Sequence, residues 1–293
     1  MQHANIVLAI GSEKEKMFQK LSILMALLAM TTSVFIGSVT AQSDMEIPVY
    51  DITITDEGLE IPDDIAPGIA AFNFDNSARE ESNSGAMLFQ LAEGVTLEAF
   101  FAGLEAAMTS DEAGPMDEIG TIRGGSWIEP GASVEIIYDL DPGQYVILEF
   151  VREVPAIAQF EISGDMEEVV DSVVADVVVD MVDYAYMMPN ELDSGEMLWE
   201  LTNSGEEEHE VAVIQILDDN LAEEDIMEFL NTGEEPSEDQ AQQLFSFIGL
   251  PPGGTAWMNV DLEPGRYLLI CFIESPDGQP HFHKGMLLLL NVN

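Results

Sequence analysis

The 293-residue chain contains an internal repeat, and this repeat strongly limits the folds open to it. Residues 68–77 (GIAAFNFDNS) match residues 195–204 (GEMLWELTNS) at an offset of 127 positions. Further along, DLDPGQY at residues 139–145 matches DLEPGRY at residues 261–267. The repeat predicts two domains of the same fold, whose bounds we place at residues 42–165 and 172–293, with an acidic boundary between them.

Each copy has the pattern of short strands separated by turns. The triplets Asp-Pro-Gly and Glu-Pro-Gly favour turns, because Pro fixes φ and Gly accepts a positive φ. Apolar and polar residues alternate around Ile52 and Ile54, and again around Val177 and Val179, as in half-buried strands. The predicted fold class is all-β: two tandem Greek-key β-sandwich domains, each with a short helical insertion.

The helical insertions are expected near the middle of each copy. Residues 97–108 are rich in Ala and Leu and predict a helix in the first copy. In the second copy we expect helices over residues 222–230 and 237–247. Ser237 is followed three residues later by Gln240, which is the spacing of a capping box at a helix start.

The N-terminus has the pattern of an export signal. Lysines within residues 14–20 precede the apolar run 21–35, and small residues stand at 39–41. We therefore predict a signal peptide over residues 1–41, of which residues 1–16 form an upstream extension if translation starts later. The protein is then periplasmic or extracellular. The alternative, an uncleaved membrane anchor, stays open because the apolar run is nearly long enough to span a bilayer.

The charge is extreme. The chain has 56 acidic and 8 basic residues, and 54 acidic and 5 basic residues remain after position 41. Such a surface repels nucleic acid and anionic lipid, so neither is an expected partner beyond an N-terminal anchor. A hydrophobic content of 47% argues against disorder. The composition predicts a folded, halophilic protein whose self-repulsion is screened by salt.

The chemistry-bearing residues cluster in the second copy. Cys271, the only cysteine, closes an apolar strand-like run and is followed by His281, His283 and Met286. His209 opens another apolar run. A thiolate, two imidazoles and a weak thioether are the ligand set of a type 1 copper site. We predict His209, Cys271, His281 and Met286 as the metal ligands of one copper per chain, with His283 as the alternative to His281.

The second copy resembles a cupredoxin in three motifs. They are Asn203-x-Gly205-x3-His209, Pro264-Gly265-x-Tyr267-x3-Cys271 and His281-x4-Met286. The resemblance implies a type 1 copper protein of the electron-transfer class. The spacing Cys271-x9-His281 is longer than in small carriers and is similar to the type 1 site of copper nitrite reductases. In the first copy Glu149 stands where Cys271 stands in the second, so that copy is expected to lack metal ligands.

The sequence also suggests what the protein does not do. Three histidines after position 41 are too few for the trinuclear site of a multicopper oxidase or the type 2 site of a nitrite reductase. No nucleophile elbow, P-loop or dinucleotide fingerprint occurs. We therefore expect no enzymatic activity, and we expect electron transfer with a redox partner protein. Periplasmic copper storage or delivery, and a metal-free envelope scaffold or adhesion module, stay as alternatives.

Overall fold

The computed structural model describes most of the chain after the N-terminal segment. The described residues are 47–79, 83–109, 116–150, 155–165, 173–218, 220–232, 236–237 and 239–293. The predicted signal peptide, residues 1–41, lies outside them. The boundary between the predicted domains falls largely on residues 166–172, also outside them, so the division into 42–165 and 172–293 stays a prediction.

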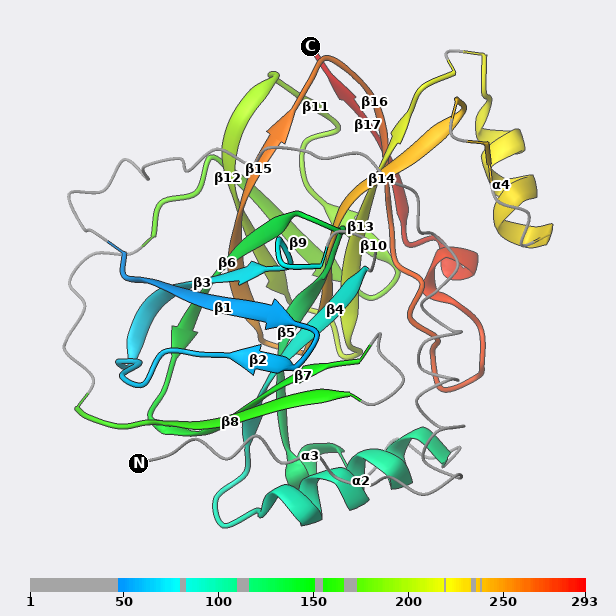
Figure 1. Ribbon diagram of the computed structural model, residues 1–293. Coiled ribbons are helices and arrows are strands. Elements are labelled where there is room, and N and C mark those ends of the chain that lie inside the picture. Colours follow the sequence, from blue (N-terminus) through cyan, green and yellow to red (C-terminus); the bar gives the residue numbers. More distant parts are fainter. Residues whose placement is uncertain are drawn as a thin grey trace.

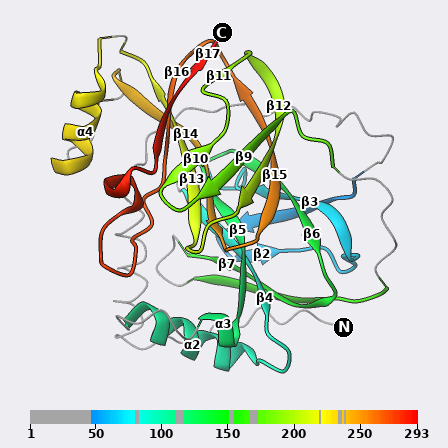
Figure 2. The ribbon, with the colours of Figure 1, turned by 180° about the vertical axis from the view of Figure 1, so that it is seen from behind.

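Two β-sheets make up most of the described structure (Figures 1 and 2). The eight-stranded sheet contains, in spatial order, β10 (Ala185–Met187), β9 (Val177–Val182), β12 (Gly195–Asn203), β15 (Thr255–Leu262), β6 (Ser133–Leu140), β3 (Gly68–Asp75), β1 (Val49–Thr55) and β2 (Gly58–Glu60). The nine-stranded sheet contains β11 (Glu191–Leu192), β17 (Leu287–Val292), β16 (Gly265–Ile270), β13 (His209–Ile216), β14 (Ala241–Leu250), β5 (Gly120–Ile128), β4 (Ser84–Leu91), β7 (Gly143–Glu149) and β8 (Ala156–Ile162).

Both sheets run from one half of the chain into the other. The N-terminal half, up to residue 165, and the C-terminal half, from residue 173, each supply strands to both sheets. The eight-stranded sheet is continuous because β15 pairs with β6. The nine-stranded sheet is continuous because β14 pairs with β5 through Ile248 and Gly125. The predicted all-β class is thus observed as two shared sheets, while the Greek-key connectivity stays a prediction.

A large apolar core draws side chains from both sheets and both halves. Its bulky members include Phe72, Tyr138, Trp199 and Tyr267, each of which is fully buried. Burial of one such side chain contributes about 1.5–3 kcal/mol relative to exposure. Alternation along each strand directs every second side chain to this core, as the apolar-polar pattern of the sequence predicted.

Two longer helices cover outer faces of the nine-stranded sheet. Helix α2 (Leu97–Thr109) begins after Thr96, whose hydroxyl accepts a hydrogen bond from the backbone N–H of Ala99 at 3.2 Å. Its buried residues pack with those of β4 and β7. Helix α4 (Glu223–Thr232) packs Ile226 against side chains of β13 and β16. Both helices were predicted, and a short helix, α3 (Met116–Ile119), follows α2.

The predicted helix over residues 237–247 is wrong, because residues 241–250 form strand β14. The local capping-box contact does form: the Gln240 side-chain oxygen accepts hydrogen bonds from the Ser237 N–H at 3.1 Å and the Ser237 hydroxyl at 2.7 Å. Pairing with β13 and β5, and complete burial of Phe247, outweigh this local signal. Tertiary pairing here overrides a weak helix preference.

Among the residues that the structure describes, no helix combines the length and the apolarity needed to cross a lipid bilayer.

Candidate metal centre

Cys271 is held at the end of an internal strand. It follows β16, which lies between β13 and β17 in the nine-stranded sheet. The turn before β16 is secured by Tyr267, whose hydroxyl donates to the Glu263 carbonyl at 2.7 Å. The Cys271 N–H donates to the carbonyl of Met286 at 3.2 Å, and its own carbonyl accepts from Phe282 at 3.1 Å. The thiol is therefore fixed by backbone bonds on both sides, and it is fully buried.

His209 is placed by the loop before β13, and Asn203 shapes that loop. The Asn203 side-chain amide donates to the carbonyls of Glu207 and Leu250, both at 2.8 Å. Its side-chain oxygen accepts from the Gly205 N–H at 2.9 Å. Three hydrogen bonds from one largely buried side chain thus hold residues 203–207 in place and bring His209 into the site.

Gly205 is needed because the site leaves no room for a side chain there. A Cβ atom at this position would meet Asp183 Oδ1 in a severe clash and would lie 2.8 Å from His209 Nε2. The Asn-x-Gly spacing of the sequence therefore has two physical causes. The Asn side chain ties the loop together, and the Gly lets the loop backbone pass close to the imidazole and its carboxylate partner.

His281 begins the 3₁₀ helix η1 (His281–Lys284), after the loop of residues 274–280. Its N–H donates to the carbonyl of Ile273 at 2.8 Å, and its carbonyl accepts from the N–H of Met286 at 3.0 Å. The loop itself turns at Gly278, which has φ +77°. These bonds connect His281, Met286 and the end of β16 in one closed segment.

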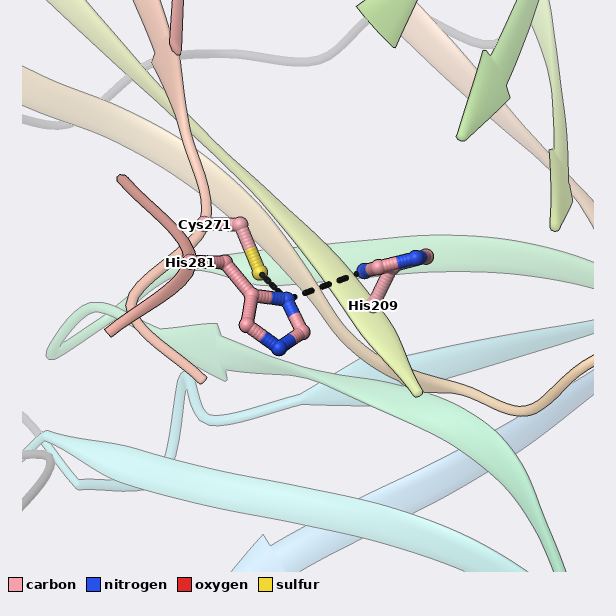
Figure 3. A group of neighbouring side chains, drawn as sticks. All are labelled: His209, Cys271 and His281. Atoms are coloured by element: carbon pink, nitrogen blue, oxygen red, sulfur yellow. Dashed lines mark hydrogen bonds between the residues drawn. The ribbon is translucent and has the colours of Figure 1, made fainter. Parts of the chain in front are cut away.

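The three side chains of His209, Cys271 and His281 converge (Figure 3). The Nδ1 atoms of His209 and His281 lie 3.1 Å apart, and Cys271 Sγ lies 3.4 Å from His281 Nδ1. One ligand-type atom from each residue lies within 4.8 Å of the other two, and all three residues are buried. Within the described residues, this is the one cluster in which three or more His, Cys, Asp or Glu side chains come together in this way.

Carboxylates hold the outer nitrogen of each imidazole. Asp183 Oδ1 lies 3.2 Å from His209 Nε2, and Glu207 Oε2 lies 3.0 Å from His281 Nε2. An ionised carboxylate can only accept, so each Nε2 carries the proton and each neutral imidazole keeps its lone pair on Nδ1. The two Nδ1 lone pairs and the Cys271 thiol then face one common point. A cation at that place relieves the repulsion between them.

The protonation states suit metal binding. Burial lowers the pKa of His209 and of His281, and the hydrogen bonds to Asp183 and Glu207 offset this only in part. Both imidazoles are therefore neutral at neutral pH. Partial burial raises the pKa of each carboxyl, but hydrogen bonds from backbone N–H groups, from the Tyr184 and Ser275 hydroxyls and from the imidazoles outweigh it, so both pKa values are lowered.

The thiol is protonated in the metal-free protein. Burial raises the pKa of Cys271, and the negative charge of Glu210 raises it further. Glu210 is itself buried, its carboxylate accepts from the Phe272 N–H at 2.7 Å, and burial raises its pKa to about 7. A thiol that coordinates a metal ion loses its proton outright. Metal binding at this site therefore releases a proton from Cys271.

The distances fit one small metal ion. Bonds of about 2.0–2.1 Å to nitrogen and about 2.3 Å to sulfur are typical of a first-row ion such as zinc. The separations of 3.1 and 3.4 Å are both shorter than the sum of two such bonds, so one ion can bridge each of these pairs, and all three donor atoms lie within 4.8 Å of one another. A thiolate with two imidazoles selects copper or zinc over calcium or magnesium, which prefer oxygen ligands.

The two other predicted residues have different positions. Met286 is fully buried and belongs to the same core cluster as Cys271. His283 is exposed, its ring packs against Phe282 with centroids 4.3 Å apart, and it is not part of the converging cluster. Of the two competing histidines, the structure therefore brings His281, and not His283, to the thiol. Both histidines belong to the 3₁₀ turn η1, which buries His281 and exposes His283.

Sequence reasoning missed the residues around the imidazoles. Asp183, Glu207 and Glu210 carry no sequence signal, because carboxylates are so abundant in this chain that none stands out. Tyr184 was also missed. Its ring packs edge-to-face on His281, with centroids 5.3 Å apart. Glu207 and Glu210 lie close to His209 in the sequence, but so does Glu208, so proximity alone did not single them out.

The N-terminal half has an ionic cluster around Glu149, the last residue of the matching strand β7. Glu149 is fully buried, and its Oε1 accepts from Arg79 Nη1 at 3.3 Å and from the Ser84 hydroxyl at 3.2 Å. Asp56 also lies 3.4 Å from Arg79 Nε. The buried guanidinium of Arg79 thus lies beside the carboxylate of Glu149, which stands where Cys271 stands in the second copy. Its positive charge compensates the negative charge of Glu149 directly.

No model of a known protein family matches the chain, and no curated protein matches it. Solved structures match it at low identity. Dithionite-reduced auracyanin from Roseiflexus castenholzii is 18% identical and covers 40% of this chain and 94% of its own, with a TM-score of 0.28. The McoA multicopper oxidase 2F4 variant from Aquifex aeolicus is 12% identical over 84% of this chain and 66% of its own, with a TM-score of 0.27. Blue copper oxidase from Nitrosomonas europaea is 12% identical over 84% and 86%, with a TM-score of 0.23.

These matches correct one prediction from the sequence. We expected no enzymatic activity because three histidines are too few for the extra copper sites of an oxidase. Multicopper oxidases nevertheless match 84% of the chain, including both halves, and this contradicts the exclusion. The number of histidines bears only on the trinuclear and type 2 copper sites of known copper enzymes. It does not exclude catalysis that uses neither of these sites. The solved structures similar to this chain are cupredoxins and multicopper oxidases, and the chain itself carries a buried His-Cys-His cluster.

Proposed function

We propose that the protein is an exported type 1 copper protein that acts in electron transfer. One copper per chain would be held by His209, Cys271 and His281, with Met286 as a fourth, weak ligand. The converging His209, Cys271 and His281 support a site in the C-terminal half, and among the described residues of the N-terminal half the buried Glu149 pairs with Arg79 where the thiol would stand.

A single observation carries the proposal: two imidazole Nδ1 atoms and one thiol converge in a buried place. Zinc accepts the same donors, but structural zinc sites are usually closed by four strong ligands. The described residues offer three, together with a buried Met286 in the same core. Two histidines, one cysteine and a weak thioether are characteristic of blue copper sites.

The rigidity of the site supports electron transfer over copper delivery. An electron carrier needs one geometry that both oxidation states accept, whereas a delivery protein must release its metal. Here each ligand is tied to a strand or to η1 by backbone hydrogen bonds, and Cys271 and Met286 bond directly to each other through their backbones at 3.2 Å. Copper, when bound, supplies a one-electron Cu(II)/Cu(I) couple.

Export and the partner rest on the sequence. The pattern of residues 1–41 supports export to the periplasm or beyond, where the redox partner is a second protein. A net charge of −48 favours a partner whose docking face is positively charged, and it favours a saline medium.

The test is copper loading of the purified protein that begins at residue 42. We expect close to one copper per chain, an intense thiolate-to-copper absorption in the visible range, and reversible one-electron reduction. Cys271→Ser removes the thiolate and should lose both the absorption and the stoichiometric copper. His283→Ala is the matched control, because its imidazole is exposed and lies outside the cluster, so copper binding should persist.

The other outcomes identify the alternatives. Rapid loss of Cu(I) to a chelator of moderate strength, without a reversible couple, indicates copper delivery. Absence of copper binding by the unmodified protein refutes the proposal and leaves a metal-free scaffold. Equal copper content in Cys271→Ser and in the unmodified protein also refutes it, because the thiolate is then not a ligand.

A further inference from the structure

The turn between β9 and β10 has an unusual backbone. Tyr184 has φ +67°, and it is the one non-glycine residue with a positive φ among the residues that the structure describes. A left-handed conformation at a bulky residue costs about 1–3 kcal/mol and persists only where the surroundings enforce it. The contacts of Asp183 and Tyr184 explain why it is tolerated here.

Asp183 connects the turn to His209. One oxygen, Oδ1, lies 3.2 Å from His209 Nε2 and also accepts from the backbone N–H groups of Glu206 at 2.9 Å and Glu207 at 3.2 Å. The carboxylate is thus fixed by two backbone donors, and it presents its charge to the outer nitrogen of the first imidazole.

Tyr184 connects the same turn to His281. Its hydroxyl donates to Glu207 Oε1 at 2.6 Å, while Glu207 Oε2 accepts from His281 Nε2 at 3.0 Å. The Tyr184 ring covers the imidazole edge-to-face at 5.3 Å. Lys284 donates to the Tyr184 oxygen at 3.3 Å, and Ser275 lies 3.5 Å from it. The phenol proton therefore goes to Glu207, because the Lys284 ammonium is itself a donor.

We propose that the Asp183–Tyr184 turn is a positioning device that sets the charge and hydrogen bonding on both imidazoles, and thereby sets the reduction potential of the copper site. The proposal deepens the function proposed above and rests on it. Neither Asp183 nor Tyr184 touches the converging Nδ1 and Sγ atoms, so each acts through a histidine.

The expected signs follow from charge. A carboxylate that accepts an Nε2–H makes the imidazole a stronger donor, which favours Cu(II) over Cu(I) and lowers the reduction potential. Loss of that charge in Glu207→Gln or Asp183→Asn should raise the potential. The phenol withdraws charge from Glu207 through a short hydrogen bond. Tyr184→Phe removes this bond while keeping the ring, so the potential should fall.

The predicted potential shifts have opposite signs in Glu207→Gln and Tyr184→Phe. A general loosening of the structure would shift the reduction potential of both variants without regard to the charge that each one changes. Glu206→Gln is the matched control. It removes the same charge one position away from Glu207, but the Glu206 side chain is exposed and bonds to no imidazole among the described residues. We expect its shift to be much smaller than that of Glu207→Gln.

The experiment is voltammetry of the copper-loaded variants together with ¹⁵N NMR of the histidine rings in the metal-free proteins. In the metal-free protein both rings should be the Nε2–H tautomer. Asp183→Asn should perturb the signals of His209, and Glu207→Gln those of His281. The NMR arm needs no copper, so it distinguishes failure of this proposal from failure of the proposed function.

Three results overturn the inference. They are equal potential shifts in Glu206→Gln and Glu207→Gln, a potential that rises or stays constant in Tyr184→Phe, and Nδ1–H tautomers in the metal-free protein. If Asp183→Asn does not fold, the Glu207→Gln and Tyr184→Phe pair still decides the question, because their predicted signs are opposite.

Discussion

The close approach of the loop backbone to the site makes Gly205→Ala the sharpest test of its architecture. The substitution adds one methyl group. That methyl would clash with Asp183 Oδ1 and would stand 2.8 Å from His209 Nε2. Gly205 does not have a positive φ, so the backbone accepts alanine without strain and the effect is purely steric. The added atom must therefore push the Asp183 carboxylate away from the imidazole.

The magnitude follows from the contact that is lost. Overpacking by one methyl in a close-packed place costs about 1–3 kcal/mol. Loss of an outer partner of a metal-binding histidine typically lowers metal affinity about 10- to 100-fold, or about 1.4–2.8 kcal/mol. The first cost falls on folding stability and the second on metal affinity, and the two are of similar size. We expect the copper affinity of Gly205→Ala to fall about 10- to 100-fold.

The assay is competition for Cu(I) and Cu(II) against chelators of known affinity, with thermal unfolding of the metal-free protein beside it. Gly265→Ala is the matched control, because a Cβ there meets its nearest atom, in Tyr267, at an ordinary 3.6 Å and the φ is not positive. Its copper affinity should equal that of the unmodified protein. If Gly205→Ala also binds copper with unchanged affinity, the Asp183–His209 contact does not support the site and the reasoning fails.

Three further predictions concern salt, pH and the axial position. With 54 acidic residues after position 41, the midpoint of thermal unfolding should rise steeply from low to molar NaCl, and a flat response would contradict the halophilic interpretation. Burial raises the pKa of Glu135, a hydrogen bond from Asn259 lowers it in part, and Asp51 raises it. A raised folded-state pKa means that ionised Glu135 destabilises the fold, so Glu135→Gln should stabilise the protein at pH 7. This gain should vanish as the pH falls through the raised pKa towards 4.5, where Glu135 is protonated in the folded protein. Urea unfolding at each pH measures it. Met286→Leu removes the thioether but keeps the volume, so copper should stay bound with a changed potential and colour, whereas complete loss of copper would show that Met286 is more than a weak ligand.

Much of the fold could be read from local patterns. Alternation and turn triplets indicated strands, and the helices over 97–108 and 222–230 were found where they were expected. The helix expected over residues 237–247 was not found. Its capping-box contact is real, yet residues 241–250 pair with strands from both halves. Local contacts depend on a few neighbouring residues. Sheet pairing depends on distant ones: β14 pairs with β13, some tens of positions earlier, and with β5 through Gly125, more than a hundred positions before Ile248.

The same division holds for the site. His209, Cys271 and His281 could be singled out because cysteine and histidine are rare here, and rarity makes coincidence informative. The choice between His281 and His283 needed η1, which buries one ring and exposes the other.

What the sequence by itself determined is the set of candidate donors, with His281 and His283 both still open, and the strand-rich character of the chain. What only the tertiary structure decided is which of many carboxylates matter. Asp183 and Glu207 are chemically identical to dozens of solvated acids, and they acquire a role only because the β9–β10 turn and the loop held by Asn203 bring them to the two imidazoles. Such a role is a property of position, and position is set by the folding of distant segments together.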